Sequence, residues 1–323
     1  MNEPDADPVD PWLFTCIGVR DDLALLPHWL DHYAALGVRP ARTVCLLNAA
    51  SSDERNLARA EAVIAARGAA SRRWIAPYTS ETMWRARRAL QAELAGQGDW
   101  VLSADVDEFH EYPAPLDAFL RRCAAMGVTC VQGPFIDRVG PGGRLAPVRT
   151  APALAAQFPV QAEVSLSLFG EGRSHNRYGT VKVMALRGQF RLDRGGHHPR
   201  EALGRAFLYG APLAAFGDIM DPRLRFALPT RVHHYHWTEA LLDRLERRLG
   251  TKGVSEAGAE YGARQLDLLR REGGVPLADV PQRQEASGED WQAVLRSVRR
   301  RAVLVRARRR LAEAKDKVAA RSR

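Results

Sequence analysis

The chain has 323 residues, of which 46% are hydrophobic and 26% are charged, so it can bury a core and is not a disordered or fibrous protein. No apolar run approaches the length that crosses a bilayer, and the acidic residues 1–11 lack the basic start and apolar run of a secretion signal, so we expect a cytoplasmic protein. The net charge of +9 lies in residues 290–323, which hold 12 Lys or Arg and three Asp or Glu, and the balanced remainder excludes a nucleic-acid-binding fold.

Strand and helix patterns alternate along the first part of the chain. Residues 1–11, rich in proline and acid, are expected to be disordered. Apolar runs predict strands over 12–19, 43–48, 73–76, 100–104 and 128–132. Apolar residues at helical spacing predict helices over 23–36, 51–68, 80–94 and 116–126. Because a helix separates each strand from the next, the sequence predicts an α/β fold with a doubly wound, mainly parallel sheet.

The pattern becomes irregular after residue 134. A strand is predicted over 180–186, helices over 238–249 and 257–271, and a linker over 272–289. We therefore expect a disordered N-terminus over 1–11, a main domain over 12–250, a helical extension and linker over 251–289, and a basic tail over 290–323.

The tail carries apolar residues at helical spacing among its arginines. This stripe consists of Trp291, Leu295, Val298, Ala302 and Val305. An isolated helix is marginal in water, whereas anionic lipid offers both an apolar layer and a negative potential. The pattern predicts a peripheral helix on the anionic inner face of a membrane. A partner-binding helix and a solvated, disordered tail are the alternatives.

Two carboxylates, Asp105 and Asp107, follow the fourth predicted strand. On extended backbone they would face the same side. Ligands of doubly wound sheets bind at the carboxyl ends of the strands. Two carboxylates at that position can hold a hard divalent cation, Mn²⁺ or Mg²⁺, which in turn can hold a diphosphate. The alternative is a solvated acidic turn without a ligand.

Three segments share their pattern with one enzyme family. They are Pro27-His28-Trp29-Leu30-Asp31-His32-Tyr33 with Leu36-Gly37-Val38, then Asp99-Trp100-Val101-Leu102 before Asp105-Val106-Asp107-Glu108-Phe109, and later His233-His234-Tyr235-His236-Trp237. Over about residues 12–250 the chain resembles the family 2 glycosyltransferases of the GT-A fold. The likeness is to the bacterial group related to the DUF23 (family 92) enzymes. It implies a GT-A-like α/β domain with a helical C-terminal extension.

The resemblance implies a metal-dependent transferase. The donor would be a nucleotide sugar, with a UDP-sugar expected, and the acceptor a hydroxyl of a saccharide or lipid-linked molecule. Asp105 would lie near the ribose and the metal, and Asp107 would coordinate the metal. A histidine of the second half, His198 or His234, would complete the ligand set of Mn²⁺ or Mg²⁺. Asp22, or Asp21 as the alternative, replaces a glutamate common at the end of the first strand and would help to seat the base.

Three further residues are expected at the donor. Asn48 ends the second strand and Asp53 follows it. Lys182, the only lysine within residues 1–251, can contact the diphosphate as a point charge.

The transfer also needs a general base for the acceptor hydroxyl. Asp137, after the fifth strand, is the candidate, and Glu163 is a weaker one. An ion pair with Arg138 is the alternative role of Asp137.

Two other functions can use the same features. A metal-dependent hydrolase would combine Asp105 and Asp107 with the histidines, and His234-x-His236 has a ligand spacing that suits it. A polyanion-binding protein would act through the basic tail, although the apolar stripe argues against simple phosphate binding. A hydrolase would usually need a denser set of metal ligands, which His234-x-His236 meets only minimally.

Overall fold

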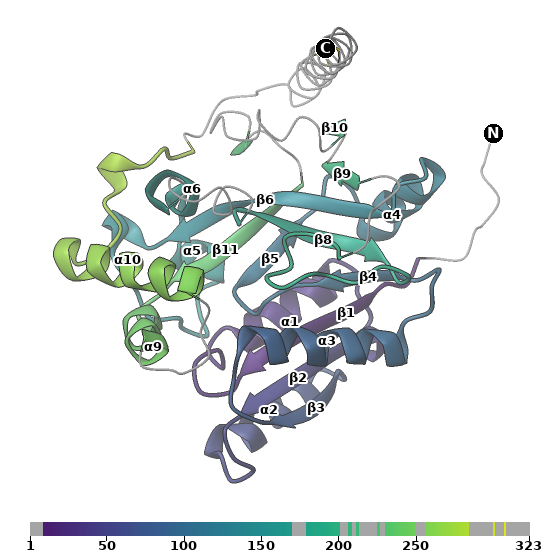
Figure 1. The fold of residues 1–323 in the computed structure, drawn as a ribbon, viewed down its shortest axis with the longest axis horizontal. Helices are drawn as coiled ribbons and strands as arrows, with labels where there is room; N and C mark the ends of the chain where they lie inside the picture. The colour runs from purple at the N-terminus through teal and green to yellow at the C-terminus, as the bar shows by residue number, and fades with distance from the viewer. Residues whose placement is uncertain are drawn as a thin grey trace, which may run out of the picture.

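We describe the fold from a computed structural model of the chain (Figure 1). The structure describes residues 9–169, 179–200, 206–208, 211–212, 225–226, 230–249 and 256–283, together with Arg300 and Ala307. The basic tail over 290–323, predicted to lie on a membrane, falls outside these residues apart from those two positions. Most of the N-terminal segment 1–11 falls outside them as well.

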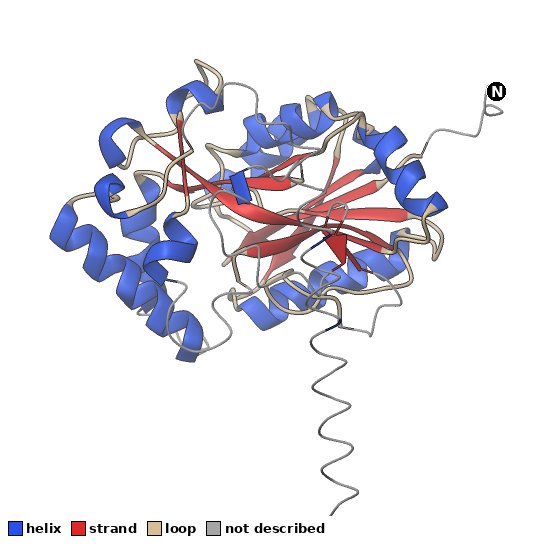
Figure 2. Cartoon of the chain, turned by 90° about the horizontal axis from the view of Figure 1, so that it is seen from above, coloured by secondary structure: helices blue, strands red, loops and turns tan. Residues whose placement is uncertain are grey.

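The first half of the chain builds a parallel sheet with helices on both faces. Its strands are β1 (Trp12–Gly18), β2 (Thr43–Ala49), β3 (Ala70–Ile75) and β4 (Trp100–Ser103). The connecting helices are α1 (Leu26–Ala35), α2 (Arg55–Ala65) and α3 (Ser80–Leu94). The strands pair in parallel in the order β3-β2-β1-β4. Figure 2 shows helices on both sides of the strands, which confirms the predicted doubly wound α/β class.

Alternating side chains of β1 serve the two faces of this sheet. Leu13 and Ile17 belong to the same buried cluster as Trp29 of α1. Phe14 points to the other face, where it packs in a cluster with Trp84 of α3. Burial of one such apolar side chain contributes about 1.5–3 kcal/mol. The fold therefore has three layers, with the sheet between two layers of helices. Each strand buries alternate side chains on its two faces, and each helix buries one apolar stripe against the sheet.

Strand β6 (Cys130–Val139) joins two parts of the sheet in the second half of the chain. Its first residues pair with β8 (Val181–Arg187), which runs antiparallel to β4, and with β9 (Ala206–Leu208), which is followed by β10 (Ala211–Pro212). Its later residues pair with β7 (Val160–Ala162) and β11 (Arg231–Trp237), and β11 also pairs with β5 (Glu108–Glu111). Parallel strands followed by an antiparallel β8 beside β4 give a mixed, mainly parallel GT-A-like sheet.

Among the residues that the structure describes, five helices accompany these strands. They are α4 (Leu116–Ala125), α5 (Leu154–Gln157), α6 (Val164–Phe169), α9 (Ala240–Leu249) and α10 (Glu256–Glu272). Helices α9 and α10 lie beside the end of β11 and form a second core, in which Trp237 packs with Leu241 and Leu269 (Figure 1). Val275 and Val280, in the stretch predicted to be a linker, belong to this core. Residues 256–283 of the predicted extension therefore pack against the main domain. Among the residues that the structure describes, no helix is long and apolar enough to span a membrane.

Gly188, just after β8, offers a test of how tightly the sheet packs. A Cβ at this position would lie 2.0 Å from the carbonyl oxygen of Gly96, and the Gly188 amide donates to the Asp99 carbonyl at 2.8 Å. We expect Gly188→Ala to lower the free energy of unfolding by about 1–3 kcal/mol, because the backbone must move. Gly98→Ala, in the loop between α3 and β4 that Gly188 contacts, has no atom near the new Cβ and is the control in urea unfolding. Equal stability of the two variants would contradict this packing.

Candidate metal and donor site

The carboxyl ends of β1, β2 and β4 share one edge of the sheet, because these strands run parallel. Gly18 at the end of β1 pairs with Asn48 of β2, and β4 leads directly into Asp105. Three residues predicted to bind a donor therefore lie along this edge: Asp22 after β1, Asn48 in β2 and Asp105 after β4.

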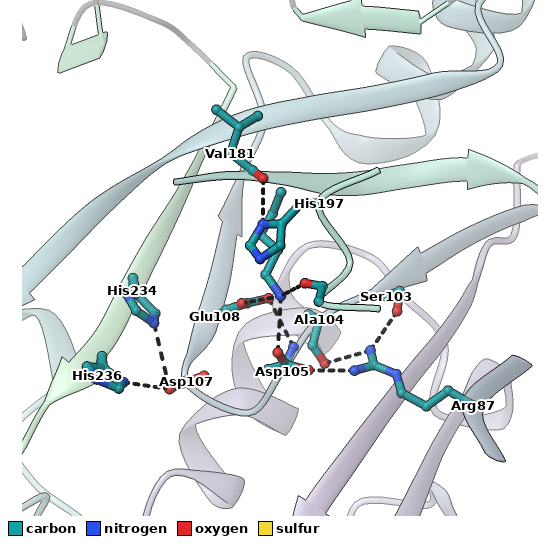
Figure 3. Close-up of polar contacts among 12 residues, drawn as sticks. Arg87, Ser103, Ala104, Asp105, Asp107, Glu108, Val181, His197, His234 and His236 are labelled. Atoms are coloured by element: carbon teal, nitrogen blue, oxygen red, sulfur yellow. Dashed lines mark hydrogen bonds and ion pairs between the residues drawn. The ribbon is translucent and has the colours of Figure 1, made fainter. Parts of the chain in front are cut away.

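The backbone turns between Asp105 and Glu108, where the sequence predicts extended chain. The Glu108 amide donates to the Asp105 carbonyl at 3.0 Å, and the Asp105 amide donates to Glu108 Oε2 at 3.1 Å. The turn directs the two aspartates to different partners, as Figure 3 shows. Asp105 contacts two cationic side chains, whereas Asp107 faces the histidines of β11.

Two buried cations hold Asp105. Arg87 of α3 donates through Nη1 to Oδ1 of Asp105 at 2.5 Å, and Lys182 of β8 donates through Nζ to Oδ2 at 3.1 Å. Arg87 also donates to the Ser103 hydroxyl at 2.6 Å and to the Phe14 carbonyl at 3.1 Å. Both oxygens of Asp105 are engaged by positive charge, so these contacts fix the chain at the end of β4.

Lys182, predicted to contact a diphosphate, lies against the turn. Its Nζ is 2.8 Å from Glu108 Oε1 and donates to the Gly195 carbonyl at 2.7 Å. Burial alone would lower the pKa of Lys182, but the carboxylates of Asp105 and Glu108 raise it, so the amine stays charged. Burial raises the pKa of Glu108 to about 7 despite the opposing charge of Lys182. Since an ammonium has three donors, contacts with Asp105, Glu108 and Gly195 use them all.

Three side chains that can ligate a metal meet at Asp107. Its Oδ2 is 3.8 Å from His234 Nε2 and 3.6 Å from His236 Nδ1. The two histidines are two residues apart on β11 and point to the same side, toward Asp107 (Figure 3). One ligand atom from each residue lies within 4.8 Å of the others. The Tyr235 amide donates to the Asp107 carbonyl at 2.8 Å, which ties the turn to β11.

Asp137 orients His234. Its Oδ1 lies 2.9 Å from His234 Nδ1 and accepts from Trp237 Nε1 at 3.0 Å. The hydroxyl and amide of Ser165, at the start of α6, donate to the same carboxylate at 2.9 and 2.7 Å. Asp137 is 1% exposed and fully hydrogen-bonded, so it cannot reach an acceptor hydroxyl as the predicted base would. Asp137 instead holds the His234 ring in position through their hydrogen bond. No ion pair of Asp137 with Arg138 is found among the described residues, and Arg138 donates instead to the carbonyls of the segment around Phe158.

Two polar side chains flank His236. Arg244 of α9 lies with Nη2 3.0 Å from His236 Nδ1, and Gln265 of α10 places its amide nitrogen 3.2 Å from His236 Nε2. Burial, together with the charge of Arg244, lowers the pKa of His236 to about 4. The ring is therefore neutral at pH 7 and keeps one lone pair for a cation.

The charges at Asp107 suit a divalent cation. Burial by itself would raise the pKa of Asp107, but the contact with His236 and the charges of His234 and Arg244 lower it well below its ordinary value. Burial would lower the pKa of His234, and the hydrogen bond with Asp137 together with the Asp107 charge raises it instead. An ionised carboxylate beside two imidazole nitrogens is a common ligand set of catalytic metal sites. The donor set therefore fits a metal.

Asp22 lies next to the group formed by Asp107, His234 and His236. Its Oδ2 accepts from the Gly18 amide at 2.9 Å, and its Oδ1 is 3.7 Å from Arg244 Nη1. The same Nη1 is 3.9 Å from Asp107 Oδ2, so Arg244 stands between the two aspartates. Burial, with the nearby charge of Asp107, raises the pKa of Asp22 to about 7 against the effect of Arg244. The structure thus brings Asp22 and Asp107 together.

Four other predicted residues lie outside the group around Asp107. Asn48 donates through Nδ2 to the carbonyls of Trp74 and Ala76 at 3.1 and 3.0 Å, which closes the end of β3. Asp53 is exposed in the loop after β2. His198 is exposed after β8 and is not in the group around Asp107. Glu163 is buried 2.6 Å from Arg225 Nε, so it is as inaccessible to an acceptor as Asp137 is.

Several residues of the site were missed from the sequence. His236 was predicted as a ligand only for the hydrolase, although its spacing of two residues from His234 puts both rings on one face of a strand. Arg87, Arg244 and Gln265 come from three helices distant in sequence. No local pattern marks them, since their roles depend on how the helices pack.

Comparisons with known proteins give remote likenesses alone. No protein-family model matches the chain, and no curated protein matches it. TarS from S. aureus is similar over 43% of this chain and 23% of its own length, with 12% identity and a TM-score of 0.28. TarS 1–349 is similar over 82% of this chain and 74% of its own, with 12% identity and a TM-score of 0.30. A mycobacterial protein is similar over 90% and 87%, with 19% identity and a TM-score of 0.31. The chain spans about a quarter of the full TarS chain that it resembles, and likenesses of this size assign it neither a family nor an activity.

Proposed function

We propose that the chain is a metal-dependent glycosyltransferase that moves a sugar from a nucleotide-sugar donor, a UDP-sugar in the first instance, to a hydroxyl of a saccharide or lipid-linked acceptor. Its place in the bacterial group related to DUF23 is part of the same proposal. The observation that carries it is the meeting of Asp107, His234 and His236 at the carboxyl edge of the parallel strands. This edge is where doubly wound sheets bind nucleotides.

Some residues at this edge of the sheet would bind the metal and the donor, and others would hold these ligands in position. Asp107, His234 and His236 would hold the cation, which supplies Lewis-acid neutralisation of the leaving nucleoside diphosphate. Arg244, beside Asp107 and Asp22, offers a guanidinium to the same anion. Asp105 keeps 34% of its side chain exposed, so it can meet the donor while Arg87 and Lys182 hold it. Asp137 keeps the His234 ring in place.

A ligand panel read by thermal unfolding tests this proposal. We expect UDP with Mn²⁺ to stabilise the full-length protein more than either one alone, and EDTA to abolish the joint effect. A ligand at a hundred times its dissociation constant adds about 2.7 kcal/mol. GDP, CDP and ADP in the same panel identify the base. If no nucleoside diphosphate stabilises the protein with any divalent cation, the proposed donor is wrong.

A metal-dependent hydrolase is a second candidate, because one carboxylate and two imidazoles also form hydrolytic centres. The products separate the two. A transferase releases the nucleoside diphosphate in step with glycosylated acceptor, whereas a hydrolase releases it in step with free sugar. Product analysis with and without a saccharide acceptor therefore distinguishes them.

Attachment to an anionic membrane is the remaining part of the proposal and rests on the sequence of residues 290–323 alone. Twelve basic residues around an apolar stripe favour it. Co-sedimentation with anionic vesicles, compared between the full chain and a chain ending at Glu289, would show whether the tail binds lipid. Equal recovery of both chains would remove the membrane from the proposal.

A further inference from the structure

We infer that the metal centre uses Asp107, His234 and His236 without Asp105, and that it therefore takes a nitrogen-preferring divalent transition metal in preference to Mg²⁺. The inference concerns the cation on which the proposed transfer rests. It starts from the separation of the two aspartates by the turn after β4.

Asp105 is already saturated with positive charge. Its Oδ1 accepts from Arg87 at 2.5 Å and its Oδ2 accepts from Lys182 at 3.1 Å. Both cations are nearly fully buried, with exposed side-chain fractions of 3% and 6%, so neither can move into solvent without leaving a buried charge unpaired. A divalent cation beside these two positive charges would meet direct repulsion. The carboxylate of Asp105 is therefore not free to coordinate a metal, and a hard cation lacks the second carboxylate that it would need.

His234 is prepared to ligate through one defined nitrogen. Asp137 contacts Nδ1 at 2.9 Å, so the ring keeps its proton there and presents Nε2 toward Asp107. Phe135 stacks on the ring at 4.3 Å between centroids, and His236 stacks at 5.0 Å on the ring of His234 as well. A carboxylate that fixes the tautomer of a metal-bound histidine is a usual companion of such ligands. The buried Asp137 thus points to a ligand independently of the Asp107 group.

His236 can present its Nδ1 in the same way. Gln265 lies 3.2 Å from His236 Nε2, and a half-turn of its amide places the carbonyl oxygen there to accept from the Nε2 proton. Nδ1 then carries the lone pair, 3.6 Å from Asp107 Oδ2. Arg244 donates to this nitrogen in the structure, which shows that Nδ1 carries the lone pair, and the guanidinium has to leave it when a metal binds. The resulting donor set is one oxygen and two imidazole nitrogens.

This donor set decides the class of metal. Imidazole suits Zn²⁺, Fe²⁺ and the neighbouring first-row ions, whereas Mg²⁺ and Ca²⁺ take oxygen ligands almost alone. Mn²⁺ binds both kinds of site, at the weak end of the first-row series. Two histidines and one carboxylate therefore favour Co²⁺, Fe²⁺ or Zn²⁺ over Mg²⁺.

Equilibrium binding to the full-length, metal-stripped protein tests the inference by titration calorimetry with Co²⁺ and with Mg²⁺. We expect Co²⁺ to bind at least about 100-fold more tightly than Mg²⁺, and H236Q to weaken Co²⁺ at least about tenfold. H233Q is the matched control, because His233 lies on the same strand but contacts Glu111 at 2.6 Å. It should leave both affinities unchanged, and urea unfolding checks that each variant is folded.

Two results would overturn the inference: equal affinities for Co²⁺ and Mg²⁺, or a loss of Co²⁺ binding in D105N as large as that in D107N. A separate outcome concerns the proposed function. If Co²⁺ binds through His236 but no nucleoside diphosphate binds, the inferred metal centre is correct and the proposed glycosyl transfer is wrong. If nucleoside diphosphates bind equally well with Mg²⁺ and Co²⁺, the proposed donor class is supported and the inferred metal preference is wrong.

Discussion

Asp107→Asn is expected to lower kcat/KM for nucleotide-sugar turnover at least about 100-fold, because metal stabilisation of the leaving group is worth several kcal/mol and each 1.36 kcal/mol is a factor of ten. Asp107 is the member of the group that supplies negative charge, and it faces His234, His236 and Arg244. Its amide replacement keeps the volume but loses the charge. The loss should appear in kcat as well as in KM, since the metal acts on charge that develops in the transition state.

The fold of this variant should survive, because the turn at Asp107 is held by backbone contacts. The Tyr235 amide donates to the Asp107 carbonyl, which the substitution leaves intact. Asp117→Asn, on the exposed face of α4, is the matched control and should turn over donor at the unchanged rate. Undiminished, EDTA-sensitive turnover in Asp107→Asn would remove Asp107 from the metal centre.

Arg225→Met is expected to cost about 3–5 kcal/mol of unfolding free energy at pH 8, because it leaves a buried carboxylate without a partner. Arg225 is fully buried, with Nε 2.6 Å from Glu163 Oε2. It also donates to the carbonyls of Phe135 and Thr180 at 2.9 and 3.2 Å. Urea unfolding at equilibrium measures the loss.

The loss should depend on pH in a defined direction. Burial raises the pKa of Glu163 from its ordinary 4.5 to about 7, although Arg225 opposes it. A carboxyl group whose pKa is raised in the fold stabilises it below the unfolded pKa, and that contribution disappears as the pH rises through the folded pKa. Without Arg225 the folded pKa rises further. The variant should therefore lose more stability than the wild type between pH 5 and pH 8.

A double variant separates charge from packing. Glu163→Gln added to Arg225→Met removes the buried charge, so it should recover part of the stability at pH 8 and flatten the pH dependence. A single variant as stable as the wild type at pH 8 would show that the pair contributes nothing. Because Glu163 directly precedes α6, whose Ser165 holds Asp137, the pair also supports the orientation of His234.

The parallel half of the fold was predictable because its signals are local. β1 alternates between two buried faces, and α1 presents Leu26, Trp29 and Tyr33 at helical spacing. The second half was harder. The predicted strand over 128–132 continues to Val139, through Gly133, Pro134 and Asp137, which are poor strand formers. A Cβ at Gly133 would lie 2.4 Å from Met184 Sδ and 3.1 Å from the Arg231 backbone, so the glycine allows the neighbouring strands β8 and β11 to approach closely. Nothing within the segment itself reveals that neighbour.

Part of the candidate site was also predictable from the sequence, and part of it was not. Asp107 and His234 were predicted from the residue types that bind metals, and the structure brings them together. The shared orientation of Asp105 and Asp107 was not found, because a turn replaces extended backbone after β4. Asp137 was predicted as a base, yet partners from α6 and β11 enclose it. Chemistry-bearing residue types are visible in sequence, whereas their exposure depends on packing between distant segments.

The two sources of the metal ligands have a consequence for the unfolded chain. Asp107 follows β4, whereas His234 and His236 lie on β11, and most of the second half of the domain lies between them. A cation held by both ends closes a long loop, as a cross-link would. The entropy of loop closure grows with loop length, so a ligand that binds only the closed form restricts conformational search across that whole interval. Loading the ion would then act on the order of chain assembly, by favouring conformations in which β11 has already docked beside β5, the strand that follows Asp107.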